Sequence, residues 1–312
     1  MVARLVEPRM IVLAGPTASG KTSLSLHLAE RFSGEIVSCD SVAVYRDMEI
    51  GTAKPDKADR ERLPHHLIEV ADPTENYTAG DYSRDARAAL SAIAARGRIP
   101  IVTGGTGLYL RALIDGLFAG PQRSESLRER LKLSDKKRGR GWLYKLLMRL
   151  DPRSAERIHP NDKPKLIRAL EVCIAAKQPM SQAWEQGRNA LQGFRILRIG
   201  LEPDRDFLYE RINKRAAAMF QDGLVEEMRM LLAKYGEARP FDSLGYKQAR
   251  ALLRGDIREA DAIALAQQGH RNYAKRQLTW FRREPEMYSL HGFGDELRIR
   301  QRAVERVEEW IG

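Results

Sequence analysis

The segment "IVLAGPTASGKTS", residues 11–23, constrains the fold more than any other part of the chain. It contains a complete G-x-x-x-x-G-K-[ST] phosphate-binding loop from Gly15 to Thr22. A continuous apolar run, "RMIVLA", precedes the loop, and an amphipathic helical pattern follows it. A buried strand, a glycine-rich loop and a helix are therefore expected in this order, which is the context in which such a loop binds an anion.

The loop residues are expected to hold the phosphates of a ligand. Glycines let backbone N–H groups curl around an anion at a helix N-terminus, where the helix dipole also favours negative charge. Lys21 adds a point charge, and the Thr22 hydroxyl is placed to bind Mg²⁺. The predicted phosphate ligands are Gly15, Pro16, Thr17, Ala18, Ser19, Gly20, Lys21 and Thr22.

Strand and helix patterns alternate over the first 115 residues. The runs "GEIVSCDS", "HHLIEV" and "RIPIVTGG" predict further buried strands, and "YTAGDYSRDARAALSAIAARG" predicts a helix between the last two. This alternation is typical of an open parallel sheet with helices on both faces. The expected fold class is α/β, with a P-loop NTPase-like parallel sheet flanked by helices and a helical insertion.

Composition and pattern divide the chain into three parts. Helical patterns rich in Lys and Arg replace the strand signal over residues 115–193, with Asn161 as a candidate N-cap and Pro164 in the following first turn. The run "FRILRIGLE" then predicts a strand that returns to the sheet. We therefore expect a core begun by residues 1–114, a helical insertion over 115–193, and a core completed by 194–312 with basic C-terminal helices.

A carboxylate and a hydroxyl follow two other predicted strands. Asp40 ends "GEIVSCD", and Thr106 lies in the glycine-rich "TGGTGLY". Because ligands of an open parallel sheet bind at the carboxyl ends of its strands, both side chains are expected to face the phosphate loop. Asp40 could hold Mg²⁺ or act as a general base, with a turn or capping aspartate as the alternative. The "TGGTGLY" loop lacks dinucleotide spacing and taken alone is equally compatible with a tight turn.

The chain is strongly basic, with 53 Lys and Arg against 42 Asp and Glu and a formal net charge of +11. Such an excess favours a polyanionic partner. In "HRNYAKRQLTWFRR" cations alternate with aromatic residues, and "NDKPKLIRALE" places Lys165 and Arg168 on one helical face. Cations beside aromatic rings suit a looped or single-stranded RNA, although either run alone could be a solvated helix face.

Cysteine usage and hydropathy bear on the compartment. Cys39 and Cys173 form no CxxC pair, which argues against a zinc site or a disulfide framework and favours a reducing cytosol. No apolar run approaches the ~20 residues that span a bilayer. We expect a cytoplasmic protein, a monomer, without a membrane partner.

Two other classes share parts of this pattern. A small-molecule P-loop kinase would have the same loop, sheet and a residue like Asp40, but seldom needs a basic insertion and a basic helical tail. An NTP-regulated RNA-binding protein is the non-enzymatic alternative, but no clear later strand ends in a second Mg²⁺-holding Asp. Neither class explains the "TGGTGLY" loop.

Six segments together resemble the tRNA isopentenyltransferase family. They are "GPTASGKTSLSLHLA", "DSVAVYRDMEIGTAKP", "HHLIEVADPTENYTAGDYSRDA", "PIVTGGTGLYLRAL", "LGYKQ" and "YAKRQLTWFR". They span roughly residues 10–285, and "IGTAKP" and "TGGTGLY" are highly specific to the family. The resemblance implies transfer of a dimethylallyl group from dimethylallyl diphosphate to N6 of the adenosine just 3′ of the anticodon in tRNA, with Mg²⁺ as cofactor.

The resemblance also implies roles for individual residues. Lys21 and Thr22 with Mg²⁺ would stabilise the leaving diphosphate, Asp40 would accept the proton of the amine, and Thr106 would lie near both. Arg215 is implied to reach the diphosphate. The implied tRNA contacts are Asp40, Ser41, Val42, Ala43, Thr106, Arg128, Pro164, Lys165, Leu166, Ile167, Arg168, Asp242, Ser243, Leu244, Gly245, Tyr246 and Lys247. The basic helix itself, rather than the resemblance, adds Arg271, Lys275, Arg276 and Gln277 as expected RNA contacts.

The chain departs from the family pattern at two positions. Ala43 stands where many relatives have Gln, and His270 stands where Thr is common. Nothing past Trp280 has the ligand spacing of the zinc finger found in eukaryotic relatives, so the chain resembles the short bacterial form. Relatives that prenylate free adenine nucleotides share much of the core, and this acceptor remains an alternative.

Overall fold

The computed structural model describes residues 7–118, 120–185 and 187–312. They form two compact units, a larger one from the described parts of 1–114 and 191–312 and a smaller one from 115–190. Within these residues, every helix is too short or too polar to cross a bilayer.

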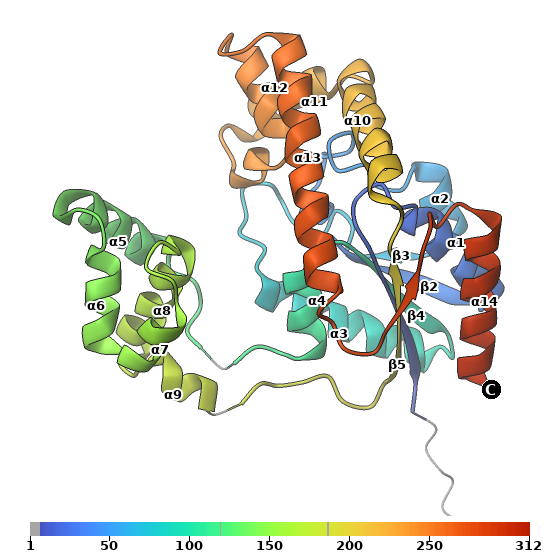
Figure 1. The fold of residues 1–312 in the computed structure, drawn as a ribbon, viewed down its shortest axis with the longest axis horizontal. Coiled ribbons are helices and arrows are strands. Elements are labelled where there is room, and N and C mark those ends of the chain that lie inside the picture. The colour runs from blue at the N-terminus through green and yellow to red at the C-terminus, as the bar shows by residue number, and fades with distance from the viewer. Residues whose placement is uncertain (1–6, 119, 186) are drawn as a thin grey trace, which may run out of the picture. The chain divides into compact units, whose positions relative to one another are not determined.

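A six-stranded parallel sheet forms the centre of the larger unit, in the order β3-β2-β4-β1-β5-β6 (Figure 1). Its strands are β1 (Arg9–Ala14), β2 (Gly34–Cys39), β3 (His65–His66), β4 (Ile99–Gly104), β5 (Arg195–Leu201) and β6 (Met287–Leu290). Strand β1 pairs with β4 on one side and β5 on the other, so the strand that enters the phosphate loop is central. The predicted α/β class with a P-loop-like parallel sheet is confirmed.

The two faces of the sheet bury different residues of β1, as the alternation of side chains along a strand requires. Met10 and Val12 pack in one core, and Ile11 and Leu13 pack in the other. Helices on the first face are α3 (Ala79–Ala95) and α4 (Gly107–Ile114), and those on the second are α1 (Lys21–Arg31) and α14 (Leu297–Ile311). The continuous apolar runs of the sequence follow from this burial on both sides.

A group of helices lies beyond the carboxyl ends of the strands (Figure 1). They are α10 (Arg205–Gln221), α11 (Leu224–Tyr235), α12 (Tyr246–Leu253) and α13 (Glu259–Phe281), with a 3₁₀ turn at Arg239–Asp242 before α12. Helix α13 contacts both α10 and α12. This group supplies the wall that faces the phosphate loop.

Two strand expectations differ from the structure. The run "HHLIEV" contributes only His65 and His66 to the sheet, because Leu67 and Glu69 adopt left-handed backbone conformations with φ of 61° and 57°. Helix α2 (Lys57–Arg62) precedes this short strand. Strand β6, in "MYSL", was not expected, because a half-buried edge strand of four residues carries little pattern.

The smaller unit is helical over its described residues. It contains α5 (Glu125–Arg138), α6 (Trp142–Leu150), α7 (Pro152–Arg157), α8 (Lys163–Ala176) and α9 (Met180–Glu185). The N-cap of α8 is Asp162, whose carboxylate accepts from Lys165 N–H, and not the expected Asn161. Pro164 lies in the first turn as expected. Leu147, Leu166 and Leu170 are buried in the core of this unit.

Candidate active site

The loop between β1 and α1 is held in its turn by glycine and by a distant segment. Gly20 has a φ of 83°, and a Cβ there would lie 2.8 Å from the backbone nitrogen of Gly294. Gly294 N–H donates to Ser19 O at 2.9 Å. The C-terminal segment around Gly294 therefore braces the back of the loop, and only glycine fits at position 20.

Lys21 is the first residue of α1 and is largely enclosed. Its Nζ donates to Pro16 O at 2.7 Å, which places the ammonium on the phosphate loop itself. Burial and, second, the positive charge of Arg215 lower the pKa of Lys21 to about 7, against the opposing charge of Asp40. The site thus holds two cations and one carboxylate close enough to act on one another, an arrangement that an added anion would stabilise.

Helices α10 and α13 reach the same loop through one side chain each. Arg215 Nη1 donates to Thr17 Oγ1 at 3.1 Å, and Thr17 N–H donates to Gln277 Oε1 at 2.8 Å. Gln277 Nε2 in turn donates to Gly105 O at 2.9 Å. The amide of Gln277, only 5% exposed, therefore joins the phosphate loop to the "TGGTG" loop. Both ends of this predicted RNA-binding side chain are used inside the protein.

Asp40 and Thr106 meet at the carboxyl ends of β2 and β4. The N–H groups of Val42 and Ala43 donate to Asp40 Oδ1 at 2.8 and 3.2 Å, which forms a tight turn. No described residue donates a hydrogen bond to Oδ2. Ser41 N–H donates to Thr106 Oγ1 at 3.1 Å, so this hydroxyl holds the turn from the neighbouring strand.

These elements surround one cavity of about 960 Å³. Its lining comprises residues 17–23, 40–43, 51–56, 103–105 and 242–244, with Lys247, Arg211, Arg215, His270, Tyr273, Arg276, Gln277 and Asp295 among the others. The phosphate loop and the Asp40 turn thus share one space, as expected from strand order. The volume suffices for a small diphosphate ester together with a nucleobase.

Other predicted residues lie outside this lining. Thr106, Arg271 and Lys275 belong to the larger unit but not to the cavity wall. Arg271 instead donates to Asn213 Oδ1, and Lys275 is exposed on α13. The RNA contacts predicted for Arg271 and Lys275 can therefore only be made at the surface around the cavity.

The predicted contacts in the insertion include two arginines that already hold a buried acid. Arg128 donates through Nε and Nη2 to the carboxylate of Glu171 at 3.2 and 3.1 Å, and Arg168 donates to it at 2.8 Å. Glu171 is fully buried, so both cations compensate its charge. A substitution of either arginine will therefore affect the stability of the insertion as well as any RNA contact.

Two of the predicted RNA-binding segments, 164–168 and 242–247, contain core side chains. Leu166, Ile167 and Tyr246 are 1%, 6% and 0% exposed. The helical period turns these side chains inward while the exposed Lys165 and Lys247 lie outward. Any RNA contact in these two segments must therefore come from outward-facing side chains such as these lysines, or from the backbone.

Arg211 and Asp295 are among the wall side chains that were not predicted as site residues. Arg211 lies one turn before Arg215 on α10, and its Nη1 donates to Asp295 Oδ1 at 2.8 Å. The i, i+4 spacing of the arginines was a readable signal, since it puts both on one helical face. Asp295 carried no signal, because its place depends on how the C-terminal segment packs behind the phosphate loop.

His270 is a half-buried base in the same wall. Burial and the positive charge of Arg215 lower its pKa from 6.5 to about 4. The unfolded chain therefore takes up a proton below pH 6.5 that the folded chain refuses, so His270 makes the fold less stable as the pH falls. We expect His270→Gln to reduce the loss of unfolding free energy between pH 7 and about pH 4.5 by about 1–2 kcal/mol, as measured by urea unfolding. The exposed control His159→Gln should change it little, and an unaltered pH dependence in His270→Gln would contradict the assignment.

The described residues contain no cluster of three or more His, Cys, Asp or Glu side chains that could hold a metal ion. The Thr22 hydroxyl lies in the cavity wall and makes no hydrogen bond with the described residues. A divalent cation here would thus depend on this hydroxyl, on a ligand's oxygens and on water. Such an all-oxygen set fits Mg²⁺, which keeps several waters and binds with substrate phosphates.

Comparison with known proteins gives one family. The profile of the IPP transferase family matches residues 43–284, and that of isopentenyl transferase matches residues 8–71. A tRNA dimethylallyltransferase of Koribacter versatilis (strain Ellin345) is 62% identical over 303 residues, covering 97% of this chain and 99% of the relative. One from Solibacter usitatus (strain Ellin6076) is 52% identical over 305 residues, covering 97% of this chain and 99% of the relative.

Solved structures agree over nearly the whole chain. The tRNA isopentenylpyrophosphate transferase of Bacillus halodurans is 34% identical with a TM-score of 0.70, covering 97% of this chain and 98% of its own. A eukaryotic dimethylallyltransferase acting on tRNA is 27% identical with a TM-score of 0.83, covering 97% of this chain and 79% of its own. These matches, together with the phosphate loop and the cavity beside it, show that the protein belongs to the IPP transferase family, the family of the tRNA dimethylallyltransferases.

Proposed function

We propose that the protein transfers a dimethylallyl group from dimethylallyl diphosphate to N6 of the adenosine immediately 3′ of the anticodon in tRNA and releases diphosphate. The observation that carries the proposal is the single cavity shared by the phosphate loop and the Asp40 turn. One side can hold a diphosphate, and the other offers a carboxylate for an amine. Family membership supports the same reaction.

The donor half of the site suits a leaving group. When the bond between the allylic carbon and its oxygen breaks, negative charge builds on the diphosphate. The N-terminus of α1, the Lys21 ammonium and the Arg215 guanidinium are fixed around this position before the reaction. Fixed charges of this kind stabilise the developing anion without reorganisation, which is the usual largest contribution to catalysis.

The acceptor half suits an aromatic amine. The N6 amine of adenine is a weak base that becomes acidic as it forms its bond to carbon, so a nearby carboxylate can take its proton. Asp40 is held by Oδ1, which leaves Oδ2 for that proton. Thr106 accepts a hydrogen bond from Ser41 N–H and so holds the turn that carries the base. The adenine must leave the stack of the anticodon loop to reach this cavity.

We propose Mg²⁺ as the cation that Thr22 would hold together with the diphosphate. It would supply further charge neutralisation for the leaving group. Lys21 and Arg215 would neutralise the rest of the negative charge on the leaving diphosphate.

We propose tRNA contacts on both units. Lys247 and Arg276 are exposed at the cavity wall of the larger unit, and Arg276 lies over the ring of Tyr273 at 5.6 Å. The insertion, residues 115–193, is proposed to contact the anticodon stem-loop through Lys165 and its neighbours. We also propose that the enzyme acts as a monomer in the cytoplasm. A small-molecule kinase and an NTP-regulated RNA-binding protein are not favoured, since the family matches cover most of the chain.

The acceptor is tested by incubating the enzyme with labelled dimethylallyl diphosphate and either an anticodon stem-loop RNA or adenosine monophosphate. We expect label on the RNA, and RNA affinity that falls steeply as salt rises, because phosphate contacts release counterions. Label on the monophosphate alone, or binding of RNA that does not depend on salt, would contradict the proposal.

A further inference from the structure

The segment that follows the Asp40 turn has an unusual backbone. Of the eight described non-glycine residues with positive φ, four lie between positions 47 and 69: Asp47, Ala53, Leu67 and Glu69. Such conformations persist only where surrounding contacts hold them, and they concentrate near functional sites. This stretch includes "IGTAKP", the family segment to which the proposed reaction gives no role.

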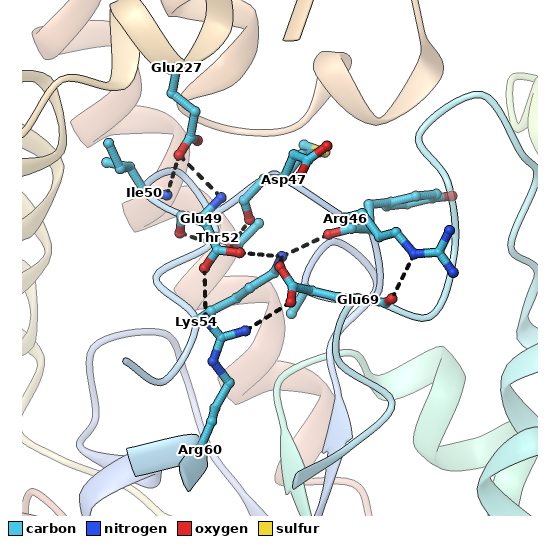
Figure 2. Close-up of polar contacts among 12 residues, drawn as sticks. Arg46, Asp47, Glu49, Ile50, Thr52, Lys54, Arg60, Glu69 and Glu227 are labelled. Carbon is cyan, nitrogen blue, oxygen red and sulfur yellow. Dashed lines mark hydrogen bonds and ion pairs between the residues drawn. The ribbon is translucent and has the colours of Figure 1, made fainter. Parts of the chain in front are cut away.

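A ring of alternating charges holds this segment (Figure 2). Lys54 Nζ donates to Glu49 Oε1 at 3.2 Å and to Glu69 Oε1 at 3.1 Å. Arg60 donates to the other oxygens of the same carboxylates, at 3.4 Å for Glu49 and 3.0 Å for Glu69. The Lys54 side chain is 1% exposed, whereas that of Arg60 is 25% exposed. Lys54 is therefore the enclosed centre of the ring.

Lys54 makes one contact that Arg60 does not. Its Nζ also donates to the backbone carbonyl of Tyr45 at 2.8 Å. Tyr45 lies in the stretch 42–46, which pairs with residues 69–71. In this pairing Glu69 N–H donates to Ala43 O at 3.1 Å. Ala43 N–H donates to Asp40 Oδ1. Two hydrogen bonds through the Ala43 backbone thus join Glu69 of the ring to the carboxylate of Asp40.

A buried acid, Glu227, holds the other end of the segment (Figure 2). Glu227 on α11 accepts from Ile50 N–H at 2.9 Å and from the Tyr246 hydroxyl at 2.6 Å. The ring of Tyr246 packs against Gly51 so closely that a side chain there would clash. Residues 51–53, between Ile50 and Lys54, line the cavity. The part of the segment that forms the cavity wall is therefore held on one side by Glu227 and on the other by the charge ring.

We propose that Lys54 is a positioning residue for Asp40: it holds the 42–46 stretch, through the Tyr45 carbonyl, so that the Asp40 carboxylate faces the acceptor amine. The inference rests on the proposed function, since it assigns Asp40 as the base. Lys54 touches neither substrate in this role. The carboxylates of Glu49 and Glu69 compensate the charge of the buried Lys54 ammonium.

Lys54→Met and Arg60→Met form a matched pair. Each removes one cation from the ring, but only the first removes the contact to Tyr45 O. We expect Lys54→Met to lower kcat by about 10- to 100-fold with the KM of both substrates within about threefold, because a misplaced base slows the chemical step and not binding. Arg60→Met should keep kcat within about threefold of the wild type.

Coupling to Asp40 separates positioning from a general structural effect. In an Asp40→Asn background, Lys54→Met should cost less than about threefold in kcat, because the group it positions is already gone. If Lys54→Met alone does not fold, Glu49→Gln/Lys54→Met removes a carboxylate along with the ammonium, and Glu49→Gln is its control. The kcat of the double variant should then be about 10- to 100-fold lower than that of Glu49→Gln.

Three outcomes would overturn the inference. They are equal losses of kcat in Lys54→Met and Arg60→Met, a full additional loss in the Asp40→Asn background, and a change confined to KM. These results leave the proposed function standing, because wild-type transfer to the stem-loop is measured in the same experiment. Absence of wild-type transfer would instead contradict the proposed function.

Discussion

Asp40→Asn should lower kcat for dimethylallyl transfer by at least about 100-fold and leave the dissociation constant for tRNA within about threefold. The amide keeps the oxygen that accepts from Val42 and Ala43, so the turn is retained. It cannot accept the proton that the adenine amine loses. Single-turnover transfer and RNA binding, measured on the same preparation, check the two parts of this expectation.

The cavity offers a control for this substitution. Asp59 also lines the cavity, but it is on α2 and pairs with Arg62. Asp59→Asn removes the same charge without touching the turn and should keep near-normal turnover. Near-normal turnover in Asp40→Asn would exclude the base role, and equal losses in both variants would mean that the charge of the cavity matters rather than the base.

Lys21→Met should have the second large effect. Removing the ammonium from the phosphate loop should lower kcat/KM for dimethylallyl diphosphate by about 10²- to 10³-fold, as expected for the loss of one preorganised group beside a developing anion. Affinity for tRNA should change little. Lys57→Met, a change at an exposed lysine of α2, is the control and should leave kcat/KM unchanged.

The pH dependence of diphosphate binding gives a second readout of Lys21. Because burial and Arg215 bring the pKa of Lys21 to about 7, the ammonium is progressively lost as pH rises through neutrality. The advantage of the wild type over Lys21→Met in binding an unreactive thio analogue of the donor should therefore shrink from pH 6 to about pH 8.5. An advantage that stays constant would mean that Lys21 does not act through its charge.

The part of the site that the sequence predicts best is the part built from local signals. The phosphate loop follows from eight adjacent residues and their flanking strand and helix. The approach of Asp40 and Thr106 follows from a general rule, since the carboxyl ends of parallel strands share one edge. No long-range contact had to be known for either prediction.

The parts that the sequence did not predict depend on contacts distant along the chain. Gln277 reaches Thr17 across 260 positions, and Gly294 reaches Ser19 from the C-terminal segment. Such pairs leave no pattern in one sequence. The short β3 was misjudged for a related reason: Leu67 and Glu69 have ordinary side chains, and it is tertiary contact that holds their left-handed backbone.

Charged residues in helices gave a mixed result. The basic pattern of the insertion predicts exposed cations, and the Lys165 side chain is 72% exposed. It could not indicate that Arg128 and Arg168 share a buried glutamate, because a single arginine can face solvent or pair inside. Burial, rather than residue type, decides which of the two roles each cation has.

In the proposed reaction this phosphate loop holds a group that is discarded, and carbon rather than phosphorus is transferred. The most direct measurement uses dimethylallyl diphosphate that carries one label in the allyl group and another in the diphosphate. After incubation with anticodon stem-loop RNA, we expect the allyl label on N6 of the adenosine 3′ of the anticodon and the phosphorus label in free diphosphate. Phosphorus label on the acceptor, or release of diphosphate without allyl label on the RNA, would contradict the proposed reaction.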